Sequence, residues 1–301
     1  MVTSLRCLTA LARGGSRRLL GVGLLLSAIG CGQGGEALAG PGLPGGLPEA
    51  PGVTGGVEIL NNRGFVVGYA GHRGAPVWVV YQARPIGERR HLDRPRFEAD
   101  PRVRRPIQYR DFTDTGFDRG HLAPNYLISN LHGPAAQRQS FLMTNIVLQR
   151  PRLNQLVWQR LEEIEVDHLA RRWDELNVTV GPVFDADRTW TDSGVDVPDA
   201  FYRIWLDRTA DGLRALALLV PQHVRGDERL DQFLITVDEI EAKTGLDFFA
   251  GLPDAIEKRL EARPADLSAW GLASLACFPA RYANNWQGKD GIRLKFDRCS
   301  D

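Results

Sequence analysis

Asp118-Arg119-Gly120-His121-Leu122-Ala123-Pro124 is the most informative segment of this 301-residue chain. Charged side chains beside a histidine are costly to bury, and Gly120 permits a close approach of the backbone that would point His121 into a cleft. A short motif of this kind, taken alone, is more typical of a surface turn with a solvated histidine. Its interpretation therefore depends on the segments that follow it.

A helical pattern begins about thirty residues downstream. Apolar residues recur with a helical period at Leu153, Leu156, Val157, Leu161, Ile164 and Leu169, which predicts a helix over Leu153–Trp173. In a regular α-helix, Asn154 and Glu162 would lie about 80° apart around the axis and about two turns apart along it. Both side chains could then face one cleft. Taken alone, Asn154 fits a helix N-cap better, and Glu162 fits an ordinary solvated side chain.

The remaining pattern indicates an α+β domain. β-Branched and aromatic runs predict a hairpin from Gly64–Tyr69 and Val77–Tyr81, and further strands at Val178–Val183, Phe201–Leu206 and Leu213–Val220. Two more helices are expected over Val237–Thr244, with Gly245 as its C-cap, and over Pro253–Arg263. We therefore expect a central, mostly antiparallel sheet flanked by helices.

Together these segments resemble the DNA/RNA non-specific endonuclease family, the ββα-metal (His-Me finger) nucleases. The Asp-Arg-Gly-His box at 118–121 matches in full, and Asn145, Gln149 and the segment from Asn154 to Glu162 match downstream. Later stretches that include Val180-Gly181-Pro182 also match. The resemblance spans roughly Val57–Glu261 and implies a fold with the histidine on a strand and the metal ligand on a crossing helix.

The resemblance implies a metal-dependent hydrolase that cuts the phosphodiester bonds of DNA and RNA, with little sequence preference, to 5′-phosphate ends. His121 would be the general base, because an imidazole can accept a proton from water at neutral pH. Asn154 would be the direct protein ligand of one Mg²⁺, with Mn²⁺ as the alternative ion. The other implied catalytic residues are Arg119, which would bind the scissile phosphate, Glu162, which would orient metal-bound water, and Asn145.

Substrate-binding roles are implied for Gln149 and for one arginine upstream, either Arg94 or Arg96. The chain departs from the family pattern at Val166, where some relatives carry an arginine that contacts phosphate. Arg160 or an arginine of the connector could substitute for it. The connector at 84–110 holds nine arginines and four acidic residues, a local positive stretch that suits phosphates. The net charge of the whole chain is zero, so no global basic signature for nucleic acid is present.

The N-terminus has the pattern of an export signal. Four arginines and no acidic residue precede an apolar run, Leu19–Gly30, and small residues precede Cys31. We predict a signal peptide at 1–30 of the lipoprotein type, with Cys31 as the first mature residue, although ordinary signal-peptidase cleavage nearby stays open. A flexible Gly- and Pro-rich tether would follow at 31–56, then a nuclease domain at 57–262 and a C-terminal extension at 263–301.

The expected location is the periplasm or cell envelope, or the medium after secretion, with membrane contact only through a lipid anchor. An exported context favours a disulfide between Cys277 and Cys299. The oligomeric state is left open. Two other functions compete with an active nuclease: an envelope lipoprotein that binds nucleic acid with weak or lost catalysis, and a secreted toxin-like effector. The intact His121, Asn154 and Glu162 argue against the first, and the sequence does not decide on the second.

Overall fold

The computed structural model describes residues 43–296, apart from residues 174 and 188 and the side chain of residue 290. The chain divides into Met1–Gly34 and Gly35–Asp301, and every described residue belongs to the second unit. The predicted signal at 1–30, Cys31 and Cys299 lie outside the described residues. Within the described part, no helix has the length and apolar character that crossing a membrane requires.

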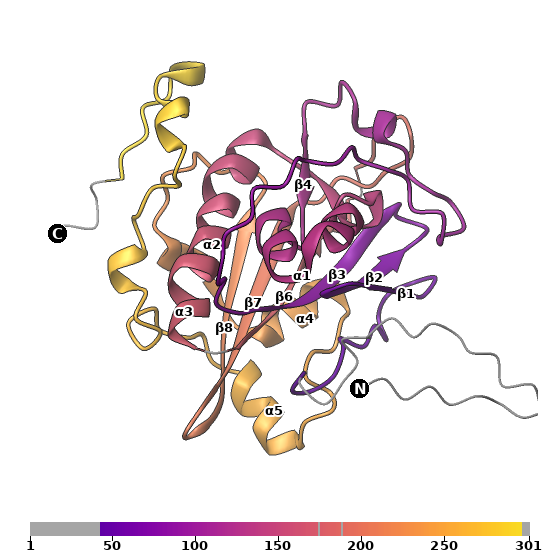
Figure 1. Ribbon diagram of the computed structural model, residues 1–301. Coiled ribbons are helices and arrows are strands. Elements are labelled where there is room, and N and C mark those ends of the chain that lie inside the picture. Colours follow the sequence, from indigo (N-terminus) through magenta and orange to yellow (C-terminus); the bar gives the residue numbers. More distant parts are fainter. Residues whose placement is uncertain (1–42, 174, 188, 297–301) are drawn as a thin grey trace, which may run out of the picture. The chain divides into compact units, whose positions relative to one another are not determined.

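A seven-stranded antiparallel sheet forms the centre of the fold (Figure 1). Its strands follow the order β1-β2-β3-β6-β7-β8-β9. Their bounds are β1 Glu58–Asn62, β2 Phe65–Ala70, β3 Ala75–Ala83, β6 Leu176–Val183, β7 Ala200–Thr209, β8 Gly212–Pro221 and β9 Leu234–Ile235. The predicted hairpin and the three later predicted strands are confirmed. Sequence patterns missed β1, which holds two apolar residues, and β9, which is only two residues long.

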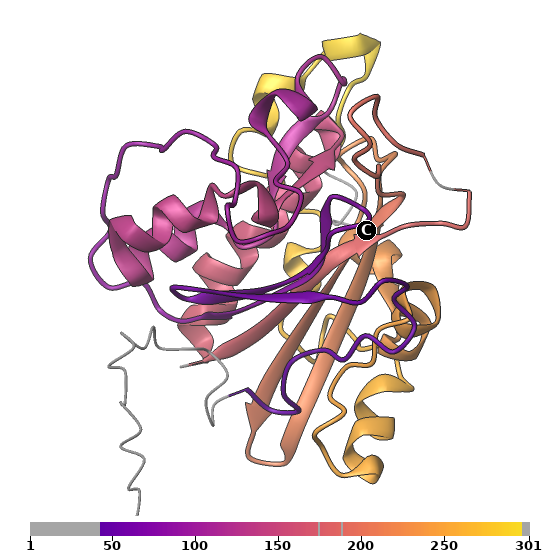
Figure 2. The same ribbon diagram turned by 90° about the vertical axis from the view of Figure 1, so that its right-hand side faces the viewer.

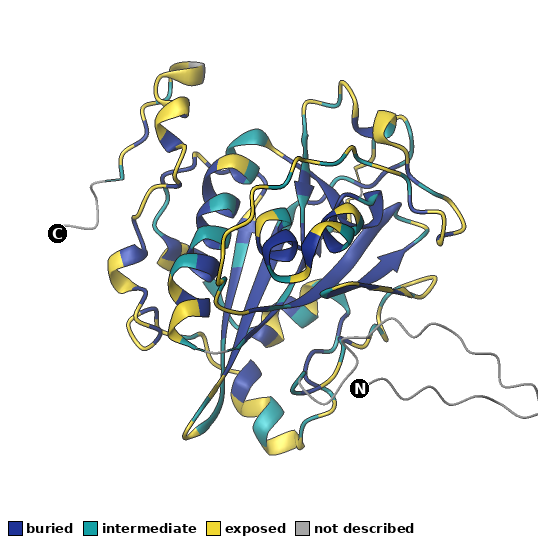
Figure 3. Ribbon diagram, in the orientation of Figure 1, coloured by how far each residue is buried: buried dark blue, intermediate teal, exposed yellow. Residues whose placement is uncertain are grey.

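The sheet is buried on both faces, as the dark strands in Figure 3 show. Successive side chains of a strand point to opposite faces, so β3 supplies Val79 and Tyr81 to one hydrophobic core and Trp78 and Val80 to the other. This explains why its strands read as nearly continuous apolar runs and show little alternation with polar residues. Burial on both sides requires a layer of helices on each.

Helices cover the two faces in separate layers (Figures 1 and 2). One layer holds α1 and a long helical run, and the other holds α4 and α5. The α-helices are α1 Asn125–Ser140, α2 Gln159–Ile164, α3 Ala170–Arg172, α4 Val237–Thr244 and α5 Asp254–Glu261. Both predicted C-terminal helices are confirmed, and Gly245 ends α4 in the left-handed conformation at φ 69°, as a C-cap requires.

The predicted helix at Leu153–Trp173 is confirmed as a helical run that contains two π-helical segments. Leu153–Trp158 is π-helical, α2 follows, Glu165–Leu169 is π-helical again, and α3 ends the run. Asn154 lies inside the first π-helical segment and is therefore not the N-cap. Short π-helical segments often occur at functional sites, but hydrophobic periodicity does not reveal them.

The sequence pattern did not predict helix α1, because a Gly-Pro pair interrupts it. Gly133 has φ 81° and ψ −172°, and Pro134 follows directly, so the helix is kinked at this point. Glycine tolerates the positive φ, and proline cannot donate the backbone hydrogen bond that a regular helix needs. Tertiary packing of Leu127, Ile128 and Ala136 against the sheet holds the two halves together.

A second, two-stranded sheet carries the Asp-Arg-Gly-His box. Strand β4 Asp118–His121 pairs antiparallel with β5 Ile146–Gln149, so that His121 faces Ile146 across the pair. The long helical run starts at Pro151, two residues after the end of β5. Two strands and a helix thus follow one another in the order β, β, α, and the histidine lies on a strand as expected.

Segments at both ends of the described chain pack on this core. Residues 43–56, assigned above to a flexible tether, instead pack against α4 and its surroundings: Glu49 and Asp247 exchange backbone hydrogen bonds of 2.9 and 3.0 Å. Leu43, Leu47 and Val53, which are apolar side chains of this Gly- and Pro-rich stretch, contact the core on that face. Short 3₁₀ helices lie at Tyr109–Phe112, Met143–Asn145, Leu230–Phe233, Ala273–Leu275, Ala283–Trp286 and Lys289–Gly291.

Candidate active site

A cleft of about 380 Å³ opens where β4 meets the helical run. Five of the eight residues predicted for the site line it, namely Arg94, Arg119, His121, Asn154 and Glu162. Among the six histidines of the chain, all of which the structure describes, His121 is the one that lines this cleft. The motif, the connector and the helix therefore meet in one place.

His121 is held by aromatic rings with its reactive nitrogen free. The ring centroid of Phe141 lies 4.7 Å from that of His121, edge to face, and that of Phe97 lies 5.5 Å away. The Nε2 atom is buried and has no hydrogen-bond partner among the described residues. Burial, helped by the positive charge of Arg94, lowers the pKa of His121 to about 3. The imidazole is therefore neutral at physiological pH, as a group that accepts a proton must be.

Asn145 fixes the backbone beside this histidine. Its Oδ1 accepts a hydrogen bond from the backbone N–H of Ala123 at 2.9 Å, and its Nδ2 donates to the carbonyls of Ala123 and Ser140. The side chain is buried, with 1% of the residue exposed, and does not line the cleft. In this structure Asn145 holds the strand end in position and does not reach the cleft, so its direct catalytic role stays a prediction.

Arg119 presents a guanidinium group whose orientation is set by its neighbours. Its Cζ lies 3.7 Å from the ring centroid of Tyr109, and its Nη2 donates to the carbonyl of Tyr109 and to Oγ1 of Thr113. Its Nε is buried without a partner in the described structure. A planar cation held in this way, with donors still available at a cleft, suits a phosphate oxygen.

Asn154 is oriented by the first residue of the Asp-Arg-Gly-His box. Its Nδ2 donates to Oδ2 of Asp118 at 2.9 Å, and Nε2 of Gln155 donates to the same oxygen at 2.7 Å. Because the amide nitrogen is engaged, the amide oxygen is the atom left to act toward the cleft. A neutral amide oxygen is a good ligand for a hard divalent cation.

Glu162 brings a carboxyl group to the same cleft. It is partly exposed, and burial of its carboxyl group raises its pKa to about 8, while the nearby cation of Arg203 acts in the opposite direction. A divalent cation in the cleft would favour the ionised form. The amide oxygen of Asn154 and the carboxylate of Glu162, which has too little positive charge around it, therefore fit Mg²⁺ or Mn²⁺ as ligands.

A buried ion pair supports this helix from below. Arg203 on β7 and Glu165 on the helical run are both fully buried, and Nη1 of Arg203 lies 2.6 Å from Oε1 of Glu165. Tyr81 and Trp205 also donate to the carboxylate of Glu165. The guanidinium of Arg203 stacks 4.2 Å from the ring centroid of Trp158. These contacts anchor the helical run to the sheet three residues beyond Glu162.

Two predicted substrate-binding residues are not at the cleft. Gln149 is fully buried behind β4, where a Cβ atom on Gly120 would lie only 1.9 Å from its Oε1, and it has no route to substrate. We predicted a substrate-binding role for Gln149 from its polar side chain, but its position on β5 points that side chain inward. Arg96 is exposed and does not line the cleft, whereas Arg94 does. Of the two alternatives, Arg94 is therefore the one placed to meet a substrate in the cleft.

The cleft contains residues that the motif did not identify. Tyr126 on α1 and Arg281 and Tyr282 of the C-terminal segment line it. Val166 lines it too, so the position that departs from the family pattern does face the site. Arg160, one suggested substitute, is 2% exposed and donates to backbone carbonyls, so it cannot reach substrate. No local sequence signal connects Arg281 to His121, which lies 160 positions earlier.

Comparisons with known proteins agree with this geometry. Residues 49–255 match a family model described as DNA/RNA non-specific endonuclease. Mitochondrial endonuclease G of Homo sapiens is 29% identical over 218 residues, 65% of this chain and 71% of that protein. A nuclease of Serratia marcescens is 33% identical over 155 residues, 50% of this chain and 57% of that protein. A chain in the crystal structure of an EndoG/EndoGI complex superimposes with a TM-score of 0.59 at 22% identity, covering 70% of this chain and 90% of that one.

Proposed function

Because the chain belongs to the DNA/RNA non-specific endonuclease family, and so is a hydrolase that acts on nucleic acid, we propose that it cuts phosphodiester bonds with His121 as general base and Asn154 as metal ligand. The products would carry 5′-phosphate ends. The observation that supports this most directly is the shared cleft, which is lined both by His121, whose Nε2 has no partner among the described residues, and by Asn154, whose amide is oriented by Asp118.

His121 accepts the proton of the attacking water. Its neutral imidazole, held between Phe97 and Phe141, presents Nε2 to the cleft. Arg119 donates to the phosphate and balances the charge that develops on it, because its planar group matches two phosphate oxygens at once. Arg94, which lines the same cleft, adds a second positive charge. Both arginines contact phosphate and no base, so weak sequence preference follows.

Asn154 would hold a divalent cation through its amide oxygen, and Glu162 would orient water in its coordination shell. When bound, this ion would supply Lewis-acid stabilisation of charge on the phosphate and on the departing oxygen. We propose Mg²⁺ as the resident ion, with Mn²⁺ as a substitute. Asp118 accepts a hydrogen bond from the amide nitrogen of Asn154 and so leaves the amide oxygen free for the ion.

Nuclease assays on plasmid DNA and on RNA test this function. We expect cleavage with Mg²⁺, its loss on addition of EDTA, and a rate about 10² to 10⁴ lower for His121→Ala, the usual cost of removing a general base. His91→Ala is the matched control, because His91 is exposed and does not line the cleft. Equal activity of His121→Ala and the parent chain would reassign the base, and tight binding without cutting by the parent would favour the non-catalytic alternative.

We further propose export, supported by the basic N-terminus, the apolar run and the residues before Cys31. Retention of a lipid-dependent envelope location by the parent, and its loss in Cys31→Ser, would support the lipoprotein form. A soluble periplasmic or secreted product from both chains would favour ordinary cleavage.

A further inference from the structure

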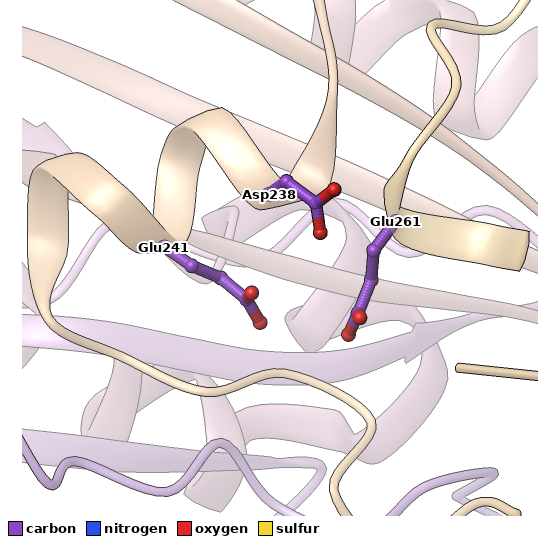
Figure 4. Close-up of side chains that lie close together, drawn as sticks. All are labelled: Asp238, Glu241 and Glu261. Carbon is purple, nitrogen blue, oxygen red and sulfur yellow. The ribbon is translucent and has the colours of Figure 1, made fainter. Parts of the chain in front are cut away.

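Three acidic side chains converge on the face of the sheet opposite the cleft (Figure 4). Asp238 and Glu241 come from α4, three residues apart and so on one face of that helix. Glu261 is the last residue of α5. One carboxylate oxygen from each lies within 4.8 Å of the others. None of the three forms an ion pair with a basic side chain anywhere in the described chain.

Glu261 is the decisive member of this group. Only 6% of the residue is exposed, and its Oε1 is buried without a hydrogen-bond partner among the described residues. A buried carboxylate oxygen that lacks a partner is costly. Figure 4 shows the carboxylate of Glu261 beside those of Asp238 and Glu241, around a common space in which a ligand would meet all three.

The backbone helps to place this group. Oε1 of Glu241 already accepts a hydrogen bond from the backbone N–H of Phe248 at 2.7 Å, which fixes this carboxylate in place. Hard carboxylate oxygens from two helices, in an irregular arrangement, match the flexible coordination of calcium better than the strict octahedron of magnesium.

We propose that Asp238, Glu241 and Glu261 bind a divalent hard cation of the calcium class that joins α4 to α5. The site is separate from the catalytic cleft, since the two lie on opposite layers of the sheet. Its role is structural: the cation neutralises the three acids and fixes the end of α5 against α4.

Calorimetric titration with CaCl₂ at pH 7.5, on chain stripped with EDTA, tests the site. Asn154→Ala serves as the parent, so that the cation site of the cleft is removed. We expect one calcium per chain and a thermal midpoint that rises by about 5 °C at saturating calcium. Glu261→Gln and the more exposed Asp238→Asn should each weaken binding at least about tenfold. Glu257→Gln, the same change one turn earlier on α5, should bind like the parent.

Two results would overturn the proposal. One is the absence of calcium binding by the parent up to about 10 mM, which would mean that a shared proton stabilises the carboxyl groups. The other is binding that Glu261→Gln and Asp238→Asn leave unchanged. Because Asp238 is exposed, its substitution tests the ligand set even if Glu261→Gln fails to fold.

A different observation concerns the C-terminal segment, which lies outside the region that matches the family model. The segment places Arg281 and Tyr282 at the cleft. The backbone N–H of Arg281 donates to the carboxylate of Glu163 at 3.0 Å, and its Nη2 lies 3.1 Å from Oδ2 of Asp167. Leu156 on the helical run packs with Ala280, Ala283, Trp286 and Leu294, and Cys277 is disulfide-bonded. The segment is thus firmly attached beside the site.

The positive charge of Arg281 is only partly neutralised by its acidic neighbour Asp167, which leaves charge available to bind a ligand. Asp167 is shared among Arg89, Arg171 and Arg281, so one carboxylate faces three guanidinium groups. Half of the Arg281 side chain is exposed, and Tyr282 is 58% exposed beside it. A surplus positive charge next to an open aromatic ring is the combination that binds a phosphate and stacks a base of single-stranded nucleic acid.

Resting on the function proposed above, we infer that Arg281 and Tyr282 bind a nucleotide next to the scissile phosphate. Fluorescence anisotropy with a labelled single-stranded oligonucleotide, in the non-cleaving His121→Ala chain, measures this without catalysis. We expect Arg281→Ala to weaken binding about tenfold and to lower the salt slope by about one, and Tyr282→Ala to weaken it by a similar factor. In the active chain both should raise KM more than they lower kcat.

Arg293→Ala is the control, because Arg293 is an exposed arginine of the same segment that does not line the cleft. If Arg281→Ala and Tyr282→Ala bind like the control, the inference is wrong while the nuclease function stands. If His121→Ala binds no nucleic acid at all and the unmodified chain cuts none, the proposed function itself fails.

Discussion

The Oδ2 atom of Asp118 and the Nδ2 atom of Asn154 lie 2.9 Å apart and join the start of β4 to the first π-helical segment of the long helical run. The carboxylate sets which end of the Asn154 amide is free.

Asp118→Ala should therefore weaken metal binding while leaving the reacting groups in place. We expect the Mg²⁺ concentration for half-maximal cleavage to rise about 10- to 100-fold, the usual cost of removing a group that orients a metal ligand. Activity at saturating Mg²⁺ should stay within a few-fold of the parent. Titration of activity with Mg²⁺ measures both, with the exposed Asp93→Ala as control, and an unchanged metal requirement would contradict the assignment.

Asn145→Ala should act on stability first. The substitution removes three hydrogen bonds to backbone groups that are themselves buried, and each lost bond costs on the order of 1 kcal/mol. We expect the free energy of unfolding to fall by about 2 to 4 kcal/mol in urea titrations. Asn284→Ala, at an exposed position of the C-terminal segment, should change it by less than about 0.5 kcal/mol. A direct catalytic role would instead lower kcat without this loss of stability.

The lowered pKa of His121 makes stability depend on pH in a defined direction. The folded value is about 3, and the unfolded value is about 6.5. Between these values the unfolded chain binds the extra proton, so stability is lost as pH falls through this window. From pH 7 to pH 5, the parent should lose up to about 2 kcal/mol more than His121→Gln, which cannot take up the proton. Equal losses in urea titrations at the two pH values would show that the imidazole is not desolvated.

Glu165→Gln should be among the most destabilising single substitutions. It leaves the guanidinium of Arg203 fully buried without its counter-charge, and breaking a buried pair from one side costs about 3 to 5 kcal/mol. Glu175→Gln removes a partner of Arg84 from an exposed pair and should cost less than about 1 kcal/mol. Similar effects of the two substitutions on urea unfolding would mean that the buried pair is hydrated.

Local patterns predicted the parts of this fold whose physics is local. Helical periodicity located the run from Leu153, and the Gly245 C-cap located the end of α4, because each depends on residues close in sequence. The kinked α1 was missed since the Gly133-Pro134 pair is a helix breaker by every local rule, and only packing against the sheet overrides it. The start of the folded part lies earlier than predicted for the same reason, because the contacts that join residues 43–56 to the core are long-range.

The candidate site shows the same division between features that depend on nearby residues and features that depend on long-range packing. The spacing within the Asp-Arg-Gly-His box and along the helix brought His121, Arg119, Asn154 and Glu162 to one cleft. Strand alternation decides that Gln149 points inward, and nothing in the type of residue reveals this. Arg281 reaches the cleft through a segment that is attached by contacts with Leu156 and Glu163, and these contacts arise only in the folded chain.

The join between the first π-helical segment, Leu153–Trp158, and α2 limits how this chain tolerates changes in length. Each residue of α2 turns the next by about 100°, so deleting one residue of α2 before Glu162 would swing the acid away from the amide of Asn154 by more than a quarter of a circle. Surface loops accept such deletions readily. On the function proposed above, the count of residues between these two side chains is itself part of the site, and we expect a one-residue deletion there to abolish cleavage while every functional group stays in the chain.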